Sequence, residues 1–109
     1  MISIRIKTDN KTVINELRVE GHAGYKKKGE DIVCAAVSIL AQTLINLLEQ
    51  LKSIKIKLIN RTGFIHLVMT EYPDICRQEL AGMTAFLVKG YFLLEKNYKQ
   101  HIKIELNSG

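Results

Sequence analysis

The sequence contains no tryptophan, a single proline and only two cysteines among its 109 residues. The two thiols, Cys34 and Cys76, are too few for a disulfide framework or for a zinc site built from cysteines alone. The three histidines (His22, His66 and His101) lack metal-ligand spacing, and no phosphate-binding loop is present. We therefore expect neither a metal nor an organic cofactor. The open question is whether either thiol is reactive.

Positive charge is only moderately in excess over negative charge. The 16 Lys and Arg residues exceed the 11 Asp and Glu residues, which gives a formal net charge of +5. The basic side chains are scattered, apart from the run Lys26-Lys27-Lys28. A nucleic-acid-binding surface usually shows a broad basic stripe, often with interleaved aromatic residues. We therefore expect no direct nucleic-acid binding.

Long hydrophobic runs are also scarce. The longest begins near Ile32, but four polar residues interrupt it: Ser38, Gln42, Thr43 and Asn46. We expect no membrane-spanning segment from this pattern. Residues 1–7 lack the basic-then-apolar layout of a signal peptide. These observations predict a cytoplasmic protein without membrane contact.

Secondary structure is predicted from the spacing of the apolar residues, which make up 47% of the chain. Alternation predicts strands and a 3.6-residue period predicts helices. The expected strands are 2–7, 13–20, 54–58, 64–69 and 102–106, and the expected helices are 31–51 and 74–97. The order ββαββαβ predicts a single α+β domain spanning residues 1–109, with an antiparallel sheet and both helices on one face.

Three glycines have predicted structural roles. Gly63 lies in the turn between the third and fourth strands, where it can adopt a positive φ. Gly82 and Gly90 lie inside the second predicted helix, where each lowers helix propensity by about 1 kcal/mol. We expect both to allow close packing against the first helix.

Cys34 has the sequence context of a reactive thiol. It falls in the first turn of the predicted helix 31–51, where unpaired backbone N–H groups and the helix dipole can stabilise a thiolate. Asp31 and Ser38 share its face, at positions i−3 and i+4 from it. His22 precedes it by twelve residues, at the end of the second strand, and the loop between them can return the imidazole to the sulfur. A cysteine paired with a histidine base is the minimum apparatus for attack on an amide.

Simpler explanations exist for each of these residues. A cysteine in an alanine-rich helix is more often a small core residue than a nucleophile. Asp31 is well placed to cap the helix. Ser38 can merely provide packing room, and a single histidine at a strand end is usually a surface residue. Cys76 has no histidine near it in sequence, and we interpret it as structural.

The segment Gly21-His22-Ala23, a gap containing glycine, and the run from Gly29 to Ser38 resemble the signature of the ribosomal-processing cysteine protease family (Prp). Chain length, the order of elements, Gly82 and Tyr72-Pro73 agree with this resemblance. It implies a thiol protease with His22 and Cys34 as the catalytic dyad and with Asp31 as an assisting group; Ser38 is our candidate for positioning. The expected substrate loop contains Gly21, Ala23, Gly24, Tyr25 and Gly29.

The resemblance also implies a substrate and an assembly. Members of the family remove the N-terminal extension of the twenty-seventh large-subunit ribosomal protein, cutting after an aromatic-rich stretch and before a small residue. They are homodimers, and their glycine loop is expected to open for substrate. In this chain, Leu87, Phe92, Leu93 and Leu94 exceed one narrow apolar stripe of the second helix, so some of them are expected to face a partner subunit.

Two other functions compete with proteolysis. A non-catalytic ribosome-associated binding module would use the positive charge to approach ribosomal RNA or an acidic partner. A thiol redox or acyl-transfer enzyme would use Cys34, although the lack of a CxxC pair weakens a redox role. Incubation with the ribosomal protein precursor, followed by mass spectrometry, separates the protease from the binding module.

Overall fold

Five strands and two long helices form the computed structural model, which describes residues 1–10, 12–22 and 31–108. The elements are β1 (Ile2–Asp9), β2 (Val13–Gly21), α1 (Ile32–Gln50), β3 (Lys55–Arg61), β4 (Phe64–Glu71), the 3-10 turn η1 (Asp74–Cys76), α2 (Arg77–Asn97) and β5 (Ile102–Ser108). The predicted order ββαββαβ is confirmed. The second predicted helix begins with the 3-10 turn, directly after Pro73.

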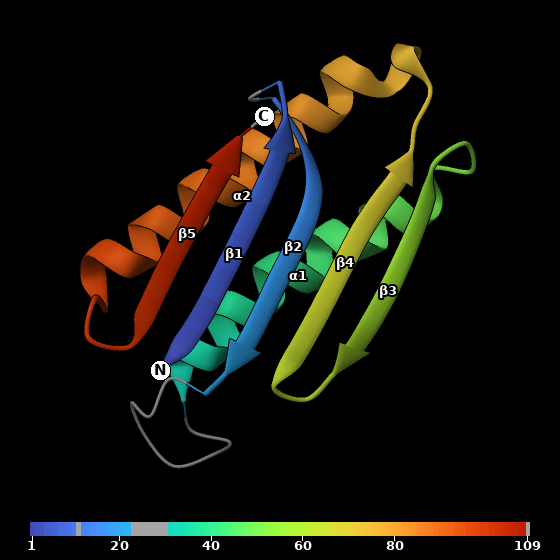
Figure 1. Ribbon diagram of the computed structural model, residues 1–109. Helices are drawn as coiled ribbons and strands as arrows, with labels where there is room; N and C mark the ends of the chain where they lie inside the picture. The colour runs from blue at the N-terminus through green and yellow to red at the C-terminus, as the bar shows by residue number, and fades with distance from the viewer. Residues whose placement is uncertain (11, 23–30, 109) are drawn as a thin grey trace.

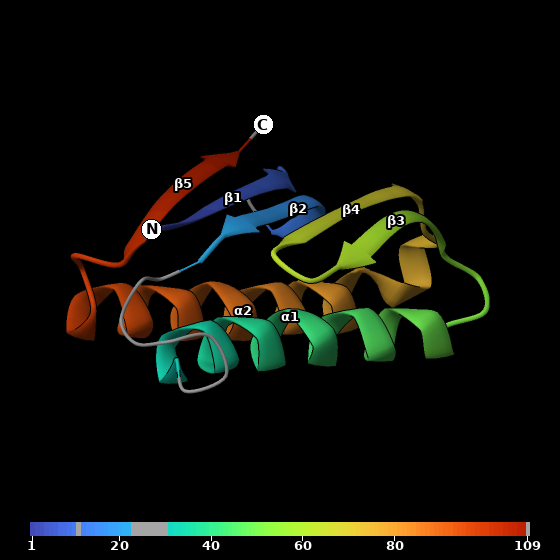
Figure 2. The ribbon, with the colours of Figure 1, turned by 90° about the horizontal axis from the view of Figure 1, so that it is seen from below.

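The strands form one sheet in the order β3-β4-β2-β1-β5 (Figure 1). Both helices lie on the same face of it, as Figure 2 shows from the side. The expected α+β fold is therefore confirmed, but the expectation of a purely antiparallel sheet is wrong, because β5 pairs with β1 in parallel. The cause is the 21-residue helix α2, which is about 31 Å long and returns the chain along the whole sheet before β5 begins. A helical crossover of this kind makes the strand that follows, β5, parallel to the strand before it, β4. Because β4 and β1 both run antiparallel to β2, β5 is also parallel to β1.

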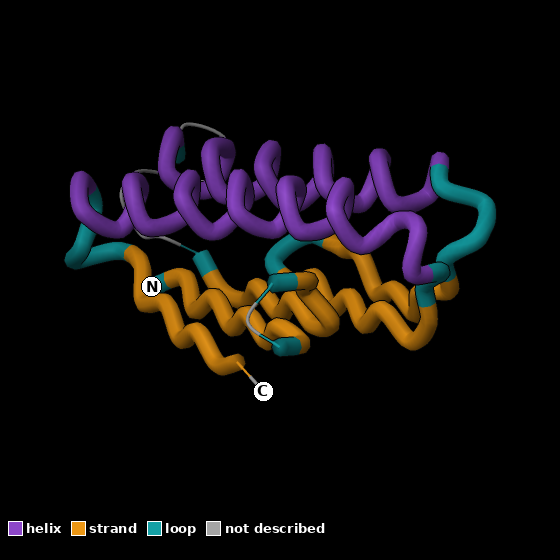
Figure 3. The backbone as a smooth tube through the Cα atoms, turned by 90° about the horizontal axis from the view of Figure 1, so that it is seen from above, coloured by secondary structure: helices purple, strands orange, loops and turns teal. Residues whose placement is uncertain are grey.

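The core lies between the sheet and the two helices. Ile2, Ile4 and Ile6 of β1 are buried, while the residues between them are exposed, so one face of the strand points to the helices. The helices contribute the buried residues Val33, Val37, Ala41, Leu44, Ile45 and Leu48 of α1 and Leu80, Thr84, Leu87 and Tyr91 of α2. Figure 3 shows the two layers that enclose this core.

Helix α1 is long and apolar enough, by length and composition, to cross a membrane. The four interrupting polar residues thus do not bring the helix below this length and apolarity, contrary to the expectation from the sequence. A core helix of a globular domain meets the same criteria, and one side of α1 is buried in the core between the sheet and α2. The polar residues that interrupt its sequence include Ser38, Thr43 and Asn46, which are exposed.

The two glycines inside α2 differ in their surroundings. A Cβ at Gly90 would lie 3.0 Å from Cδ1 of Leu40, so its lack of a side chain allows α1 to approach closely. A Cβ at Gly82 would meet no atom within 4 Å. The packing role predicted for Gly90 is confirmed, whereas that for Gly82 is wrong.

A buried hydroxyl joins the two helices. Tyr91 is fully buried on α2, and its OH donates a hydrogen bond to the carbonyl oxygen of Val37 on α1 at 3.1 Å. Burial raises the pKa of Tyr91 well above its ordinary value. The folded protein therefore strongly favours the neutral phenol, whereas the unfolded chain ionises it near pH 10.

Replacing Tyr91 with Phe keeps the ring and removes this hydrogen bond. We expect the free energy of unfolding, measured by urea denaturation near neutral pH, to fall by about 1 kcal/mol. Because the folded-state pKa is raised, the stability that the neutral phenol supports is present below about pH 10 and is lost as the pH rises further. When the pH is raised from about 10 to about 11, Tyr91→Phe should therefore lose less stability than the wild type. Equal losses in the two proteins would show that Tyr91 does not control alkaline unfolding.

Candidate active site

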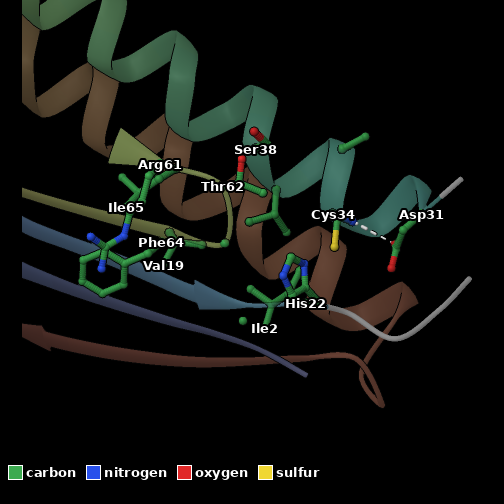
Figure 4. A pocket seen from close by; sticks show the side chains of 14 residues that line it. Ile2, Val19, His22, Asp31, Cys34, Ser38, Arg61, Thr62, Phe64 and Ile65 are labelled. Carbon is green, nitrogen blue, oxygen red and sulfur yellow. Dashed lines mark hydrogen bonds between the residues drawn. The ribbon is translucent and has the colours of Figure 1, made fainter. Parts of the chain in front are cut away.

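A pocket of about 440 Å³ opens between the start of α1, the end of β2 and the turn that joins β3 to β4. Figure 4 shows the side chains that line it. Asp31, Cys34 and Ser38 enter from α1 and His22 from the end of β2, so the structure brings together the four residues with predicted catalytic or assisting roles. The shared face predicted for the three α1 residues is confirmed.

Cys34 occupies the first turn of α1 and is half-buried, and its sulfur points into the pocket (Figure 4). Asp31 is the N-cap of the helix. Its Oδ1 accepts hydrogen bonds from the backbone N–H groups of Val33, at 2.9 Å, and of Cys34, at 3.0 Å. The carbonyl oxygen of Asp31 also accepts the N–H of Ala35 at 3.1 Å. These N–H groups are therefore paired, and the expectation that unpaired N–H groups at this turn stabilise the thiolate is wrong for these three residues.

His22 follows the last residue of β2 and is exposed at the pocket rim. The backbone before it is held by Gly21, whose N–H donates to the carbonyl oxygen of Gly63 at 3.0 Å. Gly21 has a φ of +100°, and a Cβ there would clash with the carbonyl oxygen of Met1. Only glycine fits this position without a shift of the backbone. His22 is thus attached to a tightly constrained chain segment.

The other two histidines lie elsewhere. His66 Nε2 is 2.7 Å from Oε2 of Glu16, a residue on the neighbouring strand β2. The hydrogen bond from His66 is the main reason that the pKa of the Glu16 carboxyl lies below its ordinary value. His101 lies in the turn before β5 and, like His66, does not line the pocket. Of the three histidines, His22 is therefore the one that lines the pocket with Cys34.

The remaining pocket walls are mainly apolar. They are formed by Ile2, Val19, Ala35, Val37, Phe64 and Ile65, with Arg61 and Thr62 at the β3–β4 turn. The guanidinium of Arg61 lies 5.1 Å from the centre of the Phe64 ring, and that of Arg18 lies 5.2 Å from it. Such a pocket suits an apolar side chain of a peptide ligand.

The sequence alone did not predict that residues 61–64 form part of the pocket wall. Gly63 is recognisable as a turn glycine, but only the pairing of β2 with β4 brings this turn beside His22. Of the predicted substrate loop, Gly21 lines the pocket, whereas Ala23, Gly24, Tyr25 and Gly29 lie outside the described residues. Cys76, the other cysteine, precedes α2 and does not line the pocket. Across residues 1–10, 12–22 and 31–108, no group of three or more His, Cys, Asp or Glu side chains could hold a metal ion.

Comparison with known proteins identifies the class as cysteine protease. The family model for cysteine protease Prp matches residues 1–103, so the chain belongs to this family. No curated protein sequence matches the chain.

Solved structures share the fold over the whole chain. An essential ribosomal processing protease Prp from S. aureus, in complex with a covalently linked product peptide, has a TM-score of 0.80 at 22% identity and covers 100% of both chains. The same protease with a substrate peptide has a TM-score of 0.77 at 20% identity, covering 98% of this chain and 100% of the other. SMU.848 from Streptococcus mutans has a TM-score of 0.77 at 23% identity, covering 100% of this chain and 96% of the other.

The Asp31 cap should contribute to the free energy of unfolding. Asp31→Ala removes the acceptor of two backbone N–H groups, and we expect the free energy of unfolding to fall by about 1 kcal/mol in urea denaturation. Asn caps helices about as well as Asp, so Asp31→Asn should remain within a few tenths of a kcal/mol of the wild type. If Asp31→Ala were as stable as the wild type, the cap would contribute nothing to folding.

Proposed function

We propose that this protein is a cysteine endopeptidase that removes the N-terminal extension of a large-subunit ribosomal protein, the twenty-seventh, with Cys34 as nucleophile and His22 as base. The observation that carries the proposal is the convergence of Cys34 and His22 in one apolar pocket. Membership of the Prp cysteine protease family supports it. So do the S. aureus relatives of the same fold, which are ribosomal processing proteases in complex with product and substrate peptides.

The two residues divide the chemistry as follows. His22 takes the proton of the Cys34 thiol, and the sulfur attacks the carbonyl carbon of the scissile peptide bond. The tetrahedral intermediate collapses to a thioester as His22 gives its proton to the leaving amine. Water then attacks the thioester with His22 as base, which releases the carboxylate product and restores the thiol. Every proton is accounted for without a cofactor.

Activation of the thiol depends more on His22 than on the helix terminus. The first-turn N–H groups of Val33 and Cys34 already donate to the Asp31 carboxylate, whose negative charge opposes a nearby thiolate. An adjacent imidazolium stabilises a thiolate directly through charge. The oxygen of the tetrahedral intermediate likewise needs donors other than these two N–H groups, unless the cap opens.

Asp31 and Ser38 have supporting roles in the proposal. Asp31 holds the backbone of Cys34 through its cap and is a positioning residue. Ser38 lies one turn further along α1, is exposed, and lines the pocket with a small side chain that leaves room for substrate. The apolar walls accept an aromatic side chain from the extension. The substrate itself binds as an extended peptide, for which β3 offers a sheet edge beside the pocket.

Replacement of the dyad tests the mechanism. Cys34→Ser should abolish cleavage of the purified precursor, because a hydroxyl is a much poorer nucleophile than a thiolate at this site. His22→Ala should lower turnover on the order of a hundred-fold or more, with a smaller effect on substrate binding. Mass spectrometry of the product gives the cleavage position, and circular dichroism checks the fold of each variant.

Matched variants sharpen this test. Cys76→Ser removes the other thiol, which does not line the pocket, and should cleave at the wild-type rate. Asp31→Asn keeps the cap and should retain most of the turnover that Asp31→Ala loses. Wild-type turnover by Cys34→Ser would exclude Cys34 as the nucleophile. Binding of the precursor by the wild type without cleavage would favour the non-catalytic ribosome-associated module.

The proposal includes a homodimer in the cytoplasm, formed through the helices. A groove of about 270 Å³ lies between α1 and α2 and is lined by apolar residues of both. Ile39 and Phe86 line it and are 63% and 73% exposed. Of the four α2 residues considered for partner contacts, Phe92 and Leu93 are exposed, Leu94 is partly buried and Leu87 is buried in the core. A contiguous exposed apolar surface of this kind is typical of an interaction site.

Light scattering at micromolar concentration tests the dimer. We expect the wild type to have the mass of two chains and Phe86→Glu to have the mass of one, because a charge cannot be buried unpaired in an apolar interface. Ile75→Glu provides the control, since Ile75 is a large exposed apolar residue in η1 that does not line this groove. A monomeric wild type would refute the dimer.

A further inference from the structure

The β3–β4 turn makes two separate contacts with the chain segment that carries His22. The first is the hydrogen bond from the Gly21 N–H to the Gly63 carbonyl oxygen, at 3.0 Å. It extends the β2–β4 pairing, whose last partners are Glu20 and Phe64, by one further link. His22 therefore leaves the sheet at a point fixed by the turn.

The second contact involves the imidazole itself. A Cβ built on Gly63 would lie 3.2 Å from Nε2 and 3.4 Å from Cε1 of His22. Contacts of Cβ atoms at 3.2 Å are tighter than ordinary van der Waals packing, so any side chain at position 63 would push the ring by a few tenths of an ångström. One edge of the imidazole thus lies against the backbone of Gly63, on the pocket side of the turn.

The backbone conformation alone does not explain why position 63 is a glycine. Gly63 has a φ of +78°, which favours glycine, but asparagine also adopts the left-handed region at modest cost. The close approach of the ring means that any residue with a Cβ would displace the imidazole, asparagine included. These two requirements have different consequences for substitutions, so experiments can separate them.

We propose that Gly63 is a positioning residue for His22: its missing side chain lets the imidazole lie against the β3–β4 turn in the orientation that faces Cys34. The assignment rests on the proposed function of His22 as the base. Proton transfer between the ring and the sulfur depends on their distance and alignment, and misplacement of a catalytic group by about 1 Å can lower turnover about a hundred-fold. Gly63 acts through His22 and need not touch the substrate.

The test compares three glycine variants. Gly63→Ala adds a Cβ and strains the backbone, whereas Gly63→Asn adds the same Cβ with less backbone strain. Gly82→Ala is the control, because a Cβ there meets no atom within 4 Å. We expect both Gly63 variants to lower kcat about tenfold or more on a peptide spanning the cleavage site, with KM within about twofold of the wild type. Gly82→Ala should match the wild type in both constants.

A second measurement reports on the ring without any turnover. In proton–carbon NMR spectra, the Cε1–H signal of His22, assigned by its loss in His22→Ala, should shift in both Gly63 variants. The signals of His66 and His101, which do not line the pocket, should not shift. The rate of Cys34 alkylation by iodoacetamide as a function of pH should also change, because that rate follows the thiolate that His22 stabilises.

Several outcomes would overturn the assignment. Wild-type kcat in both Gly63 variants would do so, as would full kcat in Gly63→Asn alone, which would leave backbone strain as the whole effect. A raised KM with unchanged kcat would show that Gly63 shapes the substrate pocket instead. An unmoved His22 signal would disprove the contact. Undiminished cleavage by His22→Ala would instead refute the proposed function of His22, and the NMR comparison distinguishes that failure from a failure of the contact.

Discussion

Burial of one face of the sheet beneath α1 and α2 is the constraint on which the rest of the structure depends. The alternating apolar residues of β1 and the buried stripes of both helices meet in a single core. Each helix must lie along the sheet to cover it, so each also returns the chain to the opposite end of the sheet. Together with the turns that make β1–β2 and β3–β4 antiparallel, these crossovers lead to the parallel pairing of β5 with β1.

The same constraint determines where the site lies. With α1 lying along the sheet, its first turn is held at the end of the sheet where β2 finishes and the β3–β4 turn begins. Cys34 comes from the helix, His22 from the strand end, and the pocket wall from the turn. The candidate site is therefore assembled where three separate elements of the fold meet.

The Asp31 carboxylate stabilises the helix by accepting N–H groups that a thiolate or an oxyanion would otherwise use. As the N-cap, its carboxylate accepts the N–H groups of Val33 and Cys34 and stabilises the start of α1. The same two N–H groups are then no longer available to a thiolate or to an oxyanion. The helix terminus therefore contributes order to the site. A cysteine at a helix start does not by itself indicate an activated thiol, because the cap decides what its backbone can donate.

The sequence by itself determined the elements, their order and the candidate pair of Cys34 and His22. Periodicity depends on neighbouring residues, so the alternation in β1 and the helical spacing of α1 are visible without a structure, as is the shared face of Asp31, Cys34 and Ser38. Tertiary structure alone decided the parallel pairing of β5, the contact of Gly90 with Leu40, and the place of the β3–β4 turn beside His22. Each of these depends on strand register and helix approach between segments far apart in the chain. Such contacts are selected by the packing of the whole core, and no local pattern of residues encodes them.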